Sequence, residues 1–482
     1  MCNVMKKRIY ILLTAAFTLC LACESMLEIN PKDSLPGEKA LATLGGCEAL
    51  LLGAYDMMQS TSLYGRDMIC TPEVLADNCG MAQGGYMFRS DYRNIMGSGC
   101  NIWSSAYRVI AVTNDVVAAI DKVGIDALQE GTRDRIKGEA LFIRALLYFD
   151  LLRAYCREPG QLVNNFDLGV PLITDPFISM GPDAYPVRSD IYAVWAQIEK
   201  DLNEAFRLLQ GNDGPNFPQR VTHYAAKALL ARAYLYQSKW SDAVAAADWV
   251  ITQNKPALYT GDYKDLYTNG VESIFEIRFG TSKALGSSSL HAMYATVDDG
   301  YRDEEGYGNG RGSGEGELII ADNLLAQFEE GDKRLTMMRK AYFGSNKVWW
   351  NTKFNSWQGL FGQDNIPMIR TSEVYLIRAE AYLKLATPNY SSARSDLNAL
   401  RTSRGLGATP ANDATLAAAI QKERRLELCF EGHRFFDLKR QGMDITKEAP
   451  SVTLPYTDFK VVAGIPQTEM DVNNNLVNNP GY

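Results

Sequence analysis

The chain has 482 residues, of which 22% are charged, and a formal net charge of −8 at pH 7. This acidic balance, without any basic patch interleaved with aromatic residues, argues against a nucleic-acid-binding protein. The length suits two ordinary domains or one large helical domain with a sizeable core.

The first 22 residues have the layout of a secretory signal. A short basic stretch precedes an apolar run over residues 9–21, which is too short to span a bilayer. The run ends in CLAC, which resembles a bacterial lipoprotein cleavage site with Cys23 as the lipidated residue. An ordinary signal peptide with incidental cysteines is the alternative, because so short a motif also occurs by chance. We therefore expect a lipoprotein signal peptide at 1–22 and a lipid-anchor tether at 23–38.

Helical periodicity dominates the chain that follows, over residues 38–60, 102–123 and 133–155. Two later segments, 228–251 and 377–401, each contain a helix, a short turn, an aromatic residue, and an alanine three positions further on. This pattern is typical of tetratricopeptide-like helical pairs, which stack and need cover on their outer face. Residues 135–156 and 189–209 form a third candidate pair, separated by a Pro- and Gly-bearing insertion.

The expected fold is therefore mainly α: a tetratricopeptide-like helical scaffold, an α-α superhelix, with an irregular loop-rich subdomain packed on it. Within the domain 39–482 we expect an N-terminal helical part at 39–257, a loop-rich ligand-facing insertion at 258–365, and a C-terminal region at 366–482. The insertion shows one strand-like run, at 274–279. So long a non-periodic segment is unusual in a compact domain unless it is functional.

Aromatic residues gather in the loops of this chain. Exposed flat rings hold sugars, because pyranose C–H groups stack on them while polar neighbours bind the hydroxyls. The alternative for each ring is a packing role beneath a long loop. Large rings are seldom exposed without purpose, which favours at least one tryptophan of 349–357 lining a site. The candidate ligand-binding residues are Tyr86, Tyr92, Tyr294, Tyr301, Tyr307, Trp349, Trp350 and Trp357.

Residues 421–442 read QKERRLELCFEGHRFFDLKRQG, in which apolar residues follow helical spacing. We expect one continuous helix here, with one face turned inward. Three glutamates four residues apart form a row of like charges, which requires cations from elsewhere in the fold.

The expected result is a partly buried carboxylate and guanidinium network that locks the C-terminal helix to its neighbours. Its members include Glu423, Glu427, Glu431, Arg434 and Asp437. The alternative is that Glu431, His433 and Asp437 form a catalytic acid/base set.

The sequence contains no recognised motif for a metal site, a nucleophilic triad or a phosphate-binding loop. With three histidines and no partners at a recognised spacing, neither a metal site nor a nucleophilic triad is indicated. The glycine-rich run 306–316 lacks the Lys-Ser/Thr of a phosphate-binding loop, and the acidic residues of 298–305 fit a solvated loop better than a calcium site. The six cysteines beyond residue 23 show no CxxC or zinc-like spacing, and their pairing is left open. We expect no catalytic residue, metal or cofactor.

Several widely separated stretches resemble the SusD/RagB family of nutrient-capture lipoproteins. They are CESMLEINPKDSL, NIWSSAYRVIAVTND, IRTSEVYLIRAEAYLKL, ARSDLNALRTSRGL, ERRLELCFEGHRFFDLKR and GIPQTEMDVNNNLVNNPGY. The resemblance implies a mainly helical lipoprotein on the outer face of the Gram-negative outer membrane. It also implies that the protein captures oligosaccharides and delivers them to a partner TonB-dependent SusC-like transporter. The matching motifs are architectural and transfer no sugar-contacting residue.

The function expected from residues and resemblance together is non-catalytic glycan binding. Three alternatives stay open: a peptide-capturing member of the same family, a polysaccharide hydrolase, and a tetratricopeptide scaffold that binds only protein. The hydrolase is disfavoured because nothing singles out a carboxylate pair.

Overall fold

The computed structural model describes residues 41–82, 87–95, 100–176, 185–211, 217–294, 301–303, 317–343, 346–356, 359–448 and 451–482. The predictions made for Cys23, Tyr86, Tyr307 and Trp357 fall outside these ranges.

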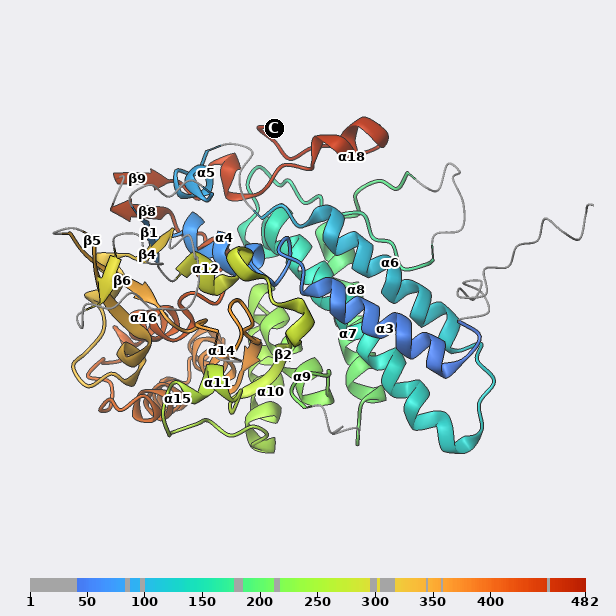
Figure 1. Cartoon of the computed structure of the whole chain (residues 1–482), viewed down its shortest axis with the longest axis horizontal. Helices are drawn as coiled ribbons and strands as arrows, with labels where there is room; N and C mark the ends of the chain where they lie inside the picture. Colours follow the sequence, from blue (N-terminus) through green and yellow to red (C-terminus); the bar gives the residue numbers. More distant parts are fainter. Residues whose placement is uncertain are drawn as a thin grey trace, which may run out of the picture.

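Long helices form the body of the molecule, and helices adjacent in the sequence pack side by side (Figure 1). They are α3 (Leu44–Met58), α6 (Trp103–Ile120), α7 (Glu130–Tyr155), α8 (Ile191–Leu208), α9 (His223–Tyr236), α10 (Trp240–Gln253), α14 (Thr371–Lys384), α15 (Tyr390–Ser403) and α16 (Leu416–Leu428). The pairs α9–α10 and α14–α15 match the two repeats in the sequence, and α10 packs on α14. Ala243 and Ala393 are fully buried where the second helix of each pair meets the first. The mainly α, tetratricopeptide-like fold class is confirmed.

Side-chain caps define where several of these helices begin. Thr43, Asp190, Thr222 and Asn389 each precede a helix and accept a hydrogen bond from a backbone N–H of its first turn. These N–H groups have no partner within the helix, so such caps stabilise the helix start.

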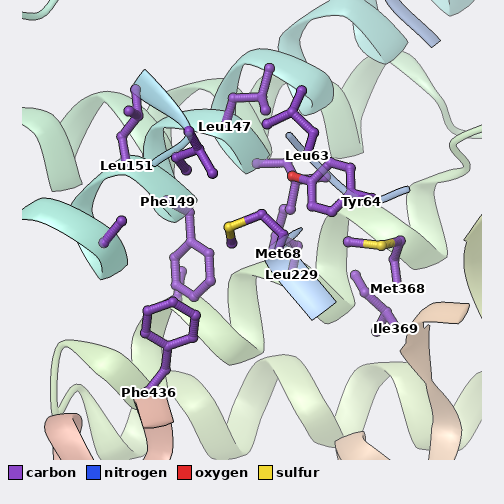
Figure 2. Packing of buried hydrophobic residues seen from close by; sticks show 14 of the residues in the cluster. Leu63, Tyr64, Met68, Leu147, Phe149, Leu151, Leu229, Met368, Ile369 and Phe436 are labelled. Carbon is purple, nitrogen blue, oxygen red and sulfur yellow. The ribbon is translucent and has the colours of Figure 1, made fainter. Parts of the chain in front are cut away.

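The centre of the core lies around α7, whose second half is buried on all sides. Figure 2 shows side chains from distant segments meeting there, including Phe149 of α7 and Phe436 of α17 (Arg434–Arg440). The Arg153 guanidinium lies over both rings, 4.8 Å from the centroid of Phe149 and 4.3 Å from that of Phe436. A helix buried on every face must pair its polar groups internally, and Asp150 accepts hydrogen bonds from Arg153 and from Tyr64.

The segment between α10 and α14 contains more strands than the one predicted. The strands in the described part of this segment are β2 (Ser273–Ile277), β3 (Tyr301–Asp303), β4 (Leu318–Ile320), β5 (Met338–Phe343), β6 (Asn346–Asn351) and β7 (Ile366–Arg370). Short helices α11 (Asp265–Thr268), α12 (Leu290–Tyr294) and α13 (Asp322–Leu325) accompany them. β2 pairs with β7 (Ile366–Arg370), and β4 pairs with β1 (Cys79–Met81). These pairings join residues far apart in the sequence, which local periodicity does not reveal.

The expectation of one continuous helix over residues 421–442 is wrong. Helix α16 ends at Leu428, and α17 begins at Arg434. Phe430 and Gly432 between them have φ values of +66° and +81°, in the left-handed region that a right-handed helix does not contain. The buried Glu73 carboxylate, on α4 (Asp67–Leu75), accepts backbone N–H bonds from Phe430, Gly432 and His433 at 2.9–3.0 Å. Hydrogen bonds to a distant carboxylate therefore replace those of the helix.

Candidate functional site

The candidate residues Tyr92, Tyr301, Trp349 and Trp350 belong to short elements at the strand-rich end of the molecule. There α5 (Arg89–Tyr92), β1, β4, β5 and β6 lie close together, with β8 (Ile445–Glu448) and β9 (Ser451–Leu454) beside them (Figure 1). α5 packs on β1, β1 pairs with β4, and β4 lies against β6. Segments from all three predicted parts of the chain thus converge on one place.

Glu317 joins the described flanks of two of these loops. Its buried carboxylate accepts hydrogen bonds from the backbone N–H groups of Met87 and Phe88, at 2.8 and 3.4 Å. Its carbonyl oxygen accepts a bond of 2.8 Å from the N–H of Ala82. The residues on both sides of the segment that carries Tyr86 therefore contact Glu317, the residue that follows the segment carrying Tyr307.

Trp349 and Trp350 are adjacent on β6 and differ in exposure. Trp350 is 1% exposed, whereas Trp349 is only partly buried. Successive side chains on a strand point to opposite faces, so two adjacent tryptophans cannot both lie on the same side of the sheet. Of this pair, Trp349 is the more exposed ring, and it also packs in part against the hydrophobic core. The expectation that Trp350 binds a ligand is corrected, because its ring is buried.

Tyr294, another candidate ligand-binding residue, is buried as well. It is 0% exposed and packs at 5.4 Å from the ring of Phe430 and 6.4 Å from that of Phe354. This is the packing role beneath a loop that was its alternative. For Tyr301 the structure describes the backbone, which lies on β3 opposite Phe343.

Tyr92 lies at the end of α5, half-buried beside a cavity of about 170 Å³. The ammonium of Lys447 lies 5.0 Å from its ring centroid and donates a hydrogen bond of 2.8 Å to the carbonyl of Val74. Burial lowers the pKa of Lys447 to about 7. The cavity is lined by Tyr92 together with the polar residues Asp322 and Asn323.

The predicted network of carboxylates and guanidinium groups lies in the interior of the protein. Glu427 is 0% exposed, and its carboxylate lies 2.8 Å from Arg370, 2.9 Å from Arg404 and 3.5 Å from Arg334. Burial raises the pKa of the Glu427 carboxyl, but Arg404 and Arg370 outweigh it, so the pKa lies well below its ordinary value. The three arginines come from three different segments of the chain, so one glutamate holds all of them to α16.

Two further glutamates of the row are paired in the same manner. Glu431 lies 2.8 Å from Arg370 and 2.7 Å from Lys353, and Glu423 lies 2.6 Å from Arg334. Each cation therefore bridges from its own segment to the C-terminal region. The repulsion along the row is offset by cations that the local sequence does not contain.

Asp437 and Arg434 extend the ion pairs along α17. Asp437 lies 2.8 Å from Arg424 and 2.9 Å from Arg440, and these cations hold its pKa below the ordinary value against the effect of burial. Arg434 pairs with Asp77 at 2.6 Å, which ties α17 to the chain after α4.

The catalytic alternative for Glu431, His433 and Asp437 finds no support in this geometry. Burial and the surrounding arginines push the pKa of His433 well below its ordinary value, so the ring stays neutral. The cavity beside Glu431 and His433 is about 10 Å³, which is at most enough to hold one water. Each carboxylate is already held by two cations, and a substrate has no room to approach.

Two larger cavities lie elsewhere, and sequence reasoning missed both. One of about 440 Å³ separates α6 from α18 (Gln467–Val472) and is lined in part by Trp103 and Tyr107. Another of about 400 Å³ lies beside Cys156 and the C-terminal segment. Both cavities are formed by segments that lie hundreds of residues apart in the sequence, so no local sequence motif predicts them.

Among the described residues, no three His, Cys, Asp or Glu side chains gather closely enough to hold a metal ion. Within the same residues, no helix is both long and apolar enough to cross a bilayer. The six cysteines after residue 40 are free and buried, and burial raises the pKa of the Cys156 thiol to about 11 and that of Cys429 to about 12.

The protein is thus a helical-repeat scaffold with aromatic rings and cations at one strand-rich end. Two family models match the chain: "SusD family" over residues 328–482 and "Starch-binding associating with outer membrane" over residues 48–235. The chain belongs to the SusD/RagB family, which confirms the resemblance seen in the sequence.

Individual relatives agree with this assignment. The "SusD-like protein P2" of Formosa agariphila is 26% identical over 95% of this chain and 96% of its own length. A SusD superfamily crystal structure from Bacteroides thetaiotaomicron is 28% identical, with a TM-score of 0.76 over 91% of this chain and all of the other. A "Laminarin binding SusD-like protein" is 25% identical, with a TM-score of 0.69 over 90% of this chain and 99% of that chain.

Proposed function

We propose that this protein is a non-catalytic cell-surface lipoprotein that captures oligosaccharides or polysaccharide fragments. In this proposal it delivers them to a partner TonB-dependent SusC-like transporter of the outer membrane. The family model described as starch-binding and associated with the outer membrane supports the ligand class and the location, and so does the laminarin-binding neighbour. The observation that carries the proposal is Trp349, a partly exposed ring on a strand held by the rigid scaffold.

The absence of catalysis is part of the proposal. Of the best acid/base candidates, Glu431 and Asp437 are occupied by structural ion pairs, and His433 is buried. Incubation of the full-length protein with laminarin and other polysaccharides should retard its migration in glycan-loaded native gels. No reducing ends should be released over the same period. Release of products would favour the hydrolase instead.

The Trp349→Ala variant should bind the retained glycan about 1–3 kcal/mol more weakly, because it removes the ring on which a sugar stacks. Isothermal titration calorimetry measures the difference directly. The matched control is Trp350→Phe, which changes the buried neighbouring ring and should leave the affinity unaltered. Equal affinities for Trp349→Ala and the unmodified protein would show that this ring is not part of the site.

The Cys23→Ala variant should appear in the soluble periplasmic fraction, because it lacks the residue that we propose to be acylated. Membrane attachment through several acyl chains is stable, whereas a protein without them has no anchor. Fractionation followed by immunoblotting measures the shift. A variant that stays in the outer-membrane fraction would contradict the lipoprotein assignment and leave glycan capture intact.

A further inference from the structure

The cavity of about 400 Å³ beside Cys156 lies where the end of α7, the chain after β9 and the last residues of the protein meet. We call it the C-terminal cavity. Its volume falls within the range of about 300–1,000 Å³ that is usual for small-ligand sites. Neither Tyr92 nor Trp349 lines it, so it is separate from the aromatic positions considered so far.

Hydrogen bonds between distant segments fix the walls of the C-terminal cavity. The Arg157 guanidinium donates to the carbonyl oxygens of Tyr456 and Asp458, at 2.5 and 2.8 Å. The Asn479 amide donates to the carbonyl oxygen of Tyr155 at 2.8 Å. All three wall segments are therefore tied together before any ligand arrives, which reduces the ordering that binding would otherwise require.

Two phenylalanine rings line the cavity, and both are partly exposed. The Arg188 guanidinium lies over the ring of Phe166, 5.5 Å from its centroid. The Tyr482 ring packs edge-on against Phe459 at 5.2 Å. Gly481, with a φ of +100°, approaches the same ring so closely that an added Cβ would lie 2.4 Å from it. Each ring is thus supported by neighbours while part of its surface stays open.

Polar side chains on the cavity wall are available to a ligand. Asn164 and Thr457 line the cavity and are exposed, and neither side chain is hydrogen-bonded to another residue of the described chain. Asp458 uses one carboxylate oxygen to accept the backbone N–H of Lys460 at 2.9 Å. Arg157 brings the opposite charge, and its guanidinium is already committed to two carbonyl oxygens. The lining is therefore close to neutral and rich in hydrogen-bonding groups.

We propose that the C-terminal cavity is a second saccharide site, which binds a short neutral stretch of the captured glycan. Sugars combine C–H faces that stack on rings with hydroxyl groups that need hydrogen-bond partners, and this lining supplies both. An anionic ligand would meet no uncommitted cation, and an apolar one would strip water from Asn164 and Thr457 without replacing its hydrogen bonds.

The inference rests on the proposed function, because it adds a second contact for the same ligand class. A polymer that reaches both sites would bind more tightly than a short oligosaccharide, since the second contact forms within the complex.

The test counts binding sites with neutral trisaccharides too short to be gripped like a polymer. Laminaritriose and maltotriose represent the polymers named for a structural neighbour and a family model, and cellotriose, xylotriose and mannotriose extend the set. Isothermal titration calorimetry of the full-length protein should find two molar equivalents of at least one trisaccharide. The Trp349→Ala variant should retain the equivalent that belongs to the C-terminal cavity.

Variants of the cavity wall should weaken this retained equivalent. Adding Phe166→Ala to Trp349→Ala removes a stacking ring and should weaken it about tenfold. Adding Asn164→Gly or Thr457→Val removes one polar group each and should weaken it about threefold or more. Glycine at 164 accepts the φ of +54° found there.

The matched control is Phe206→Ala in the same background. Phe206 is a partly buried ring of α8 that lines neither of the two large cavities, so its loss should not change the affinity. Circular dichroism and thermal unfolding establish that each variant is folded.

Four outcomes would overturn the inference. A single equivalent that is lost in Trp349→Ala and unaffected by Phe166→Ala would remove the second site while glycan capture stands. An equal loss in Phe206→Ala would remove the assignment to this cavity. Binding of tri-alanine that depends on Phe166, without binding of any trisaccharide, would replace the saccharide by a peptide.

The fourth outcome separates the inference from the proposed function. A protein that binds no trisaccharide but is retarded by polysaccharides in native gels would lose the second site alone. A protein that binds neither would overturn the proposed function together with the inference.

Discussion

Replacing Glu427 by Gln should destabilise the protein by about 3–5 kcal/mol, the range observed when one partner of a buried ion pair is removed. The substitution keeps the shape of the side chain and removes its charge. Arg334, Arg370 and Arg404 then remain buried with one anion fewer among them. The midpoint of urea unfolding, followed by tryptophan fluorescence, measures the loss.

The control for this variant is an ion pair at the surface. Glu204 lies 2.7 Å from Arg207, at side-chain exposures of 38% and 65%. Solvent screens such pairs, so Glu204→Gln should leave the unfolding midpoint nearly unchanged. Similar midpoints for the Glu427 and Glu204 variants would show that the buried network contributes little to stability. The cost expected for Glu427→Gln arises from unpaired guanidinium groups, and a network replaced as a whole by apolar residues need not show it.

Replacing Gly432 by Ala should cost about 3 kcal/mol or more. Its φ of +81° is unfavourable for a residue with a Cβ by about 1–2 kcal/mol. A Cβ at this position would also lie 2.4 Å from the carbonyl oxygen of Met68, which belongs to the backbone of α4 and is not free to move aside. Relief of that contact would displace the turn whose N–H groups Glu73 binds. Thermal unfolding monitored by circular dichroism measures the change.

Gly53→Ala is the matched control for Gly432→Ala. Gly53 lies inside α3, has no positive φ, and has no atom within 4 Å of the position of an added Cβ. Alanine there should stabilise the protein by about 0.5–1 kcal/mol, because glycine is a poor helix former. The two substitutions are chemically identical and should shift the unfolding temperature in opposite directions. A Gly432→Ala variant as stable as the unmodified protein would show that the 429–433 turn tolerates rearrangement.

Local sequence was sufficient to predict the scaffold. Helix α9 and its partner α10 were visible as a helical period, a turn, and an alanine at the point of closest approach. Those features act over a few residues, so a local pattern records them. The strands β5 and β6 escaped because short strands of mixed polarity owe their order to pairing with each other and to the packing of β4 against β6.

The break between α16 and α17 escaped for a related reason. The apolar spacing of Leu426, Cys429 and Phe430 suits one continuous helix. However, Glu73, more than 350 residues away in the sequence, binds the turn between α16 and α17. Gly432 was the single local signal, because glycine readily takes the positive φ found there.

The amino-acid sequence predicts the signal-like start and the repeated helical pairs. It also reveals the row of glutamates that requires cations and the aromatic residues in the loops. Contacts between distant segments determine which cations meet those glutamates, and they leave Trp349 partly exposed while Trp350 and Tyr294 are buried. The two kinds of feature differ in the sequence separation over which their interactions act. Helical periodicity and charge spacing arise within a few residues, whereas exposure and ion pairing depend on strand register and on packing between segments far apart in the chain.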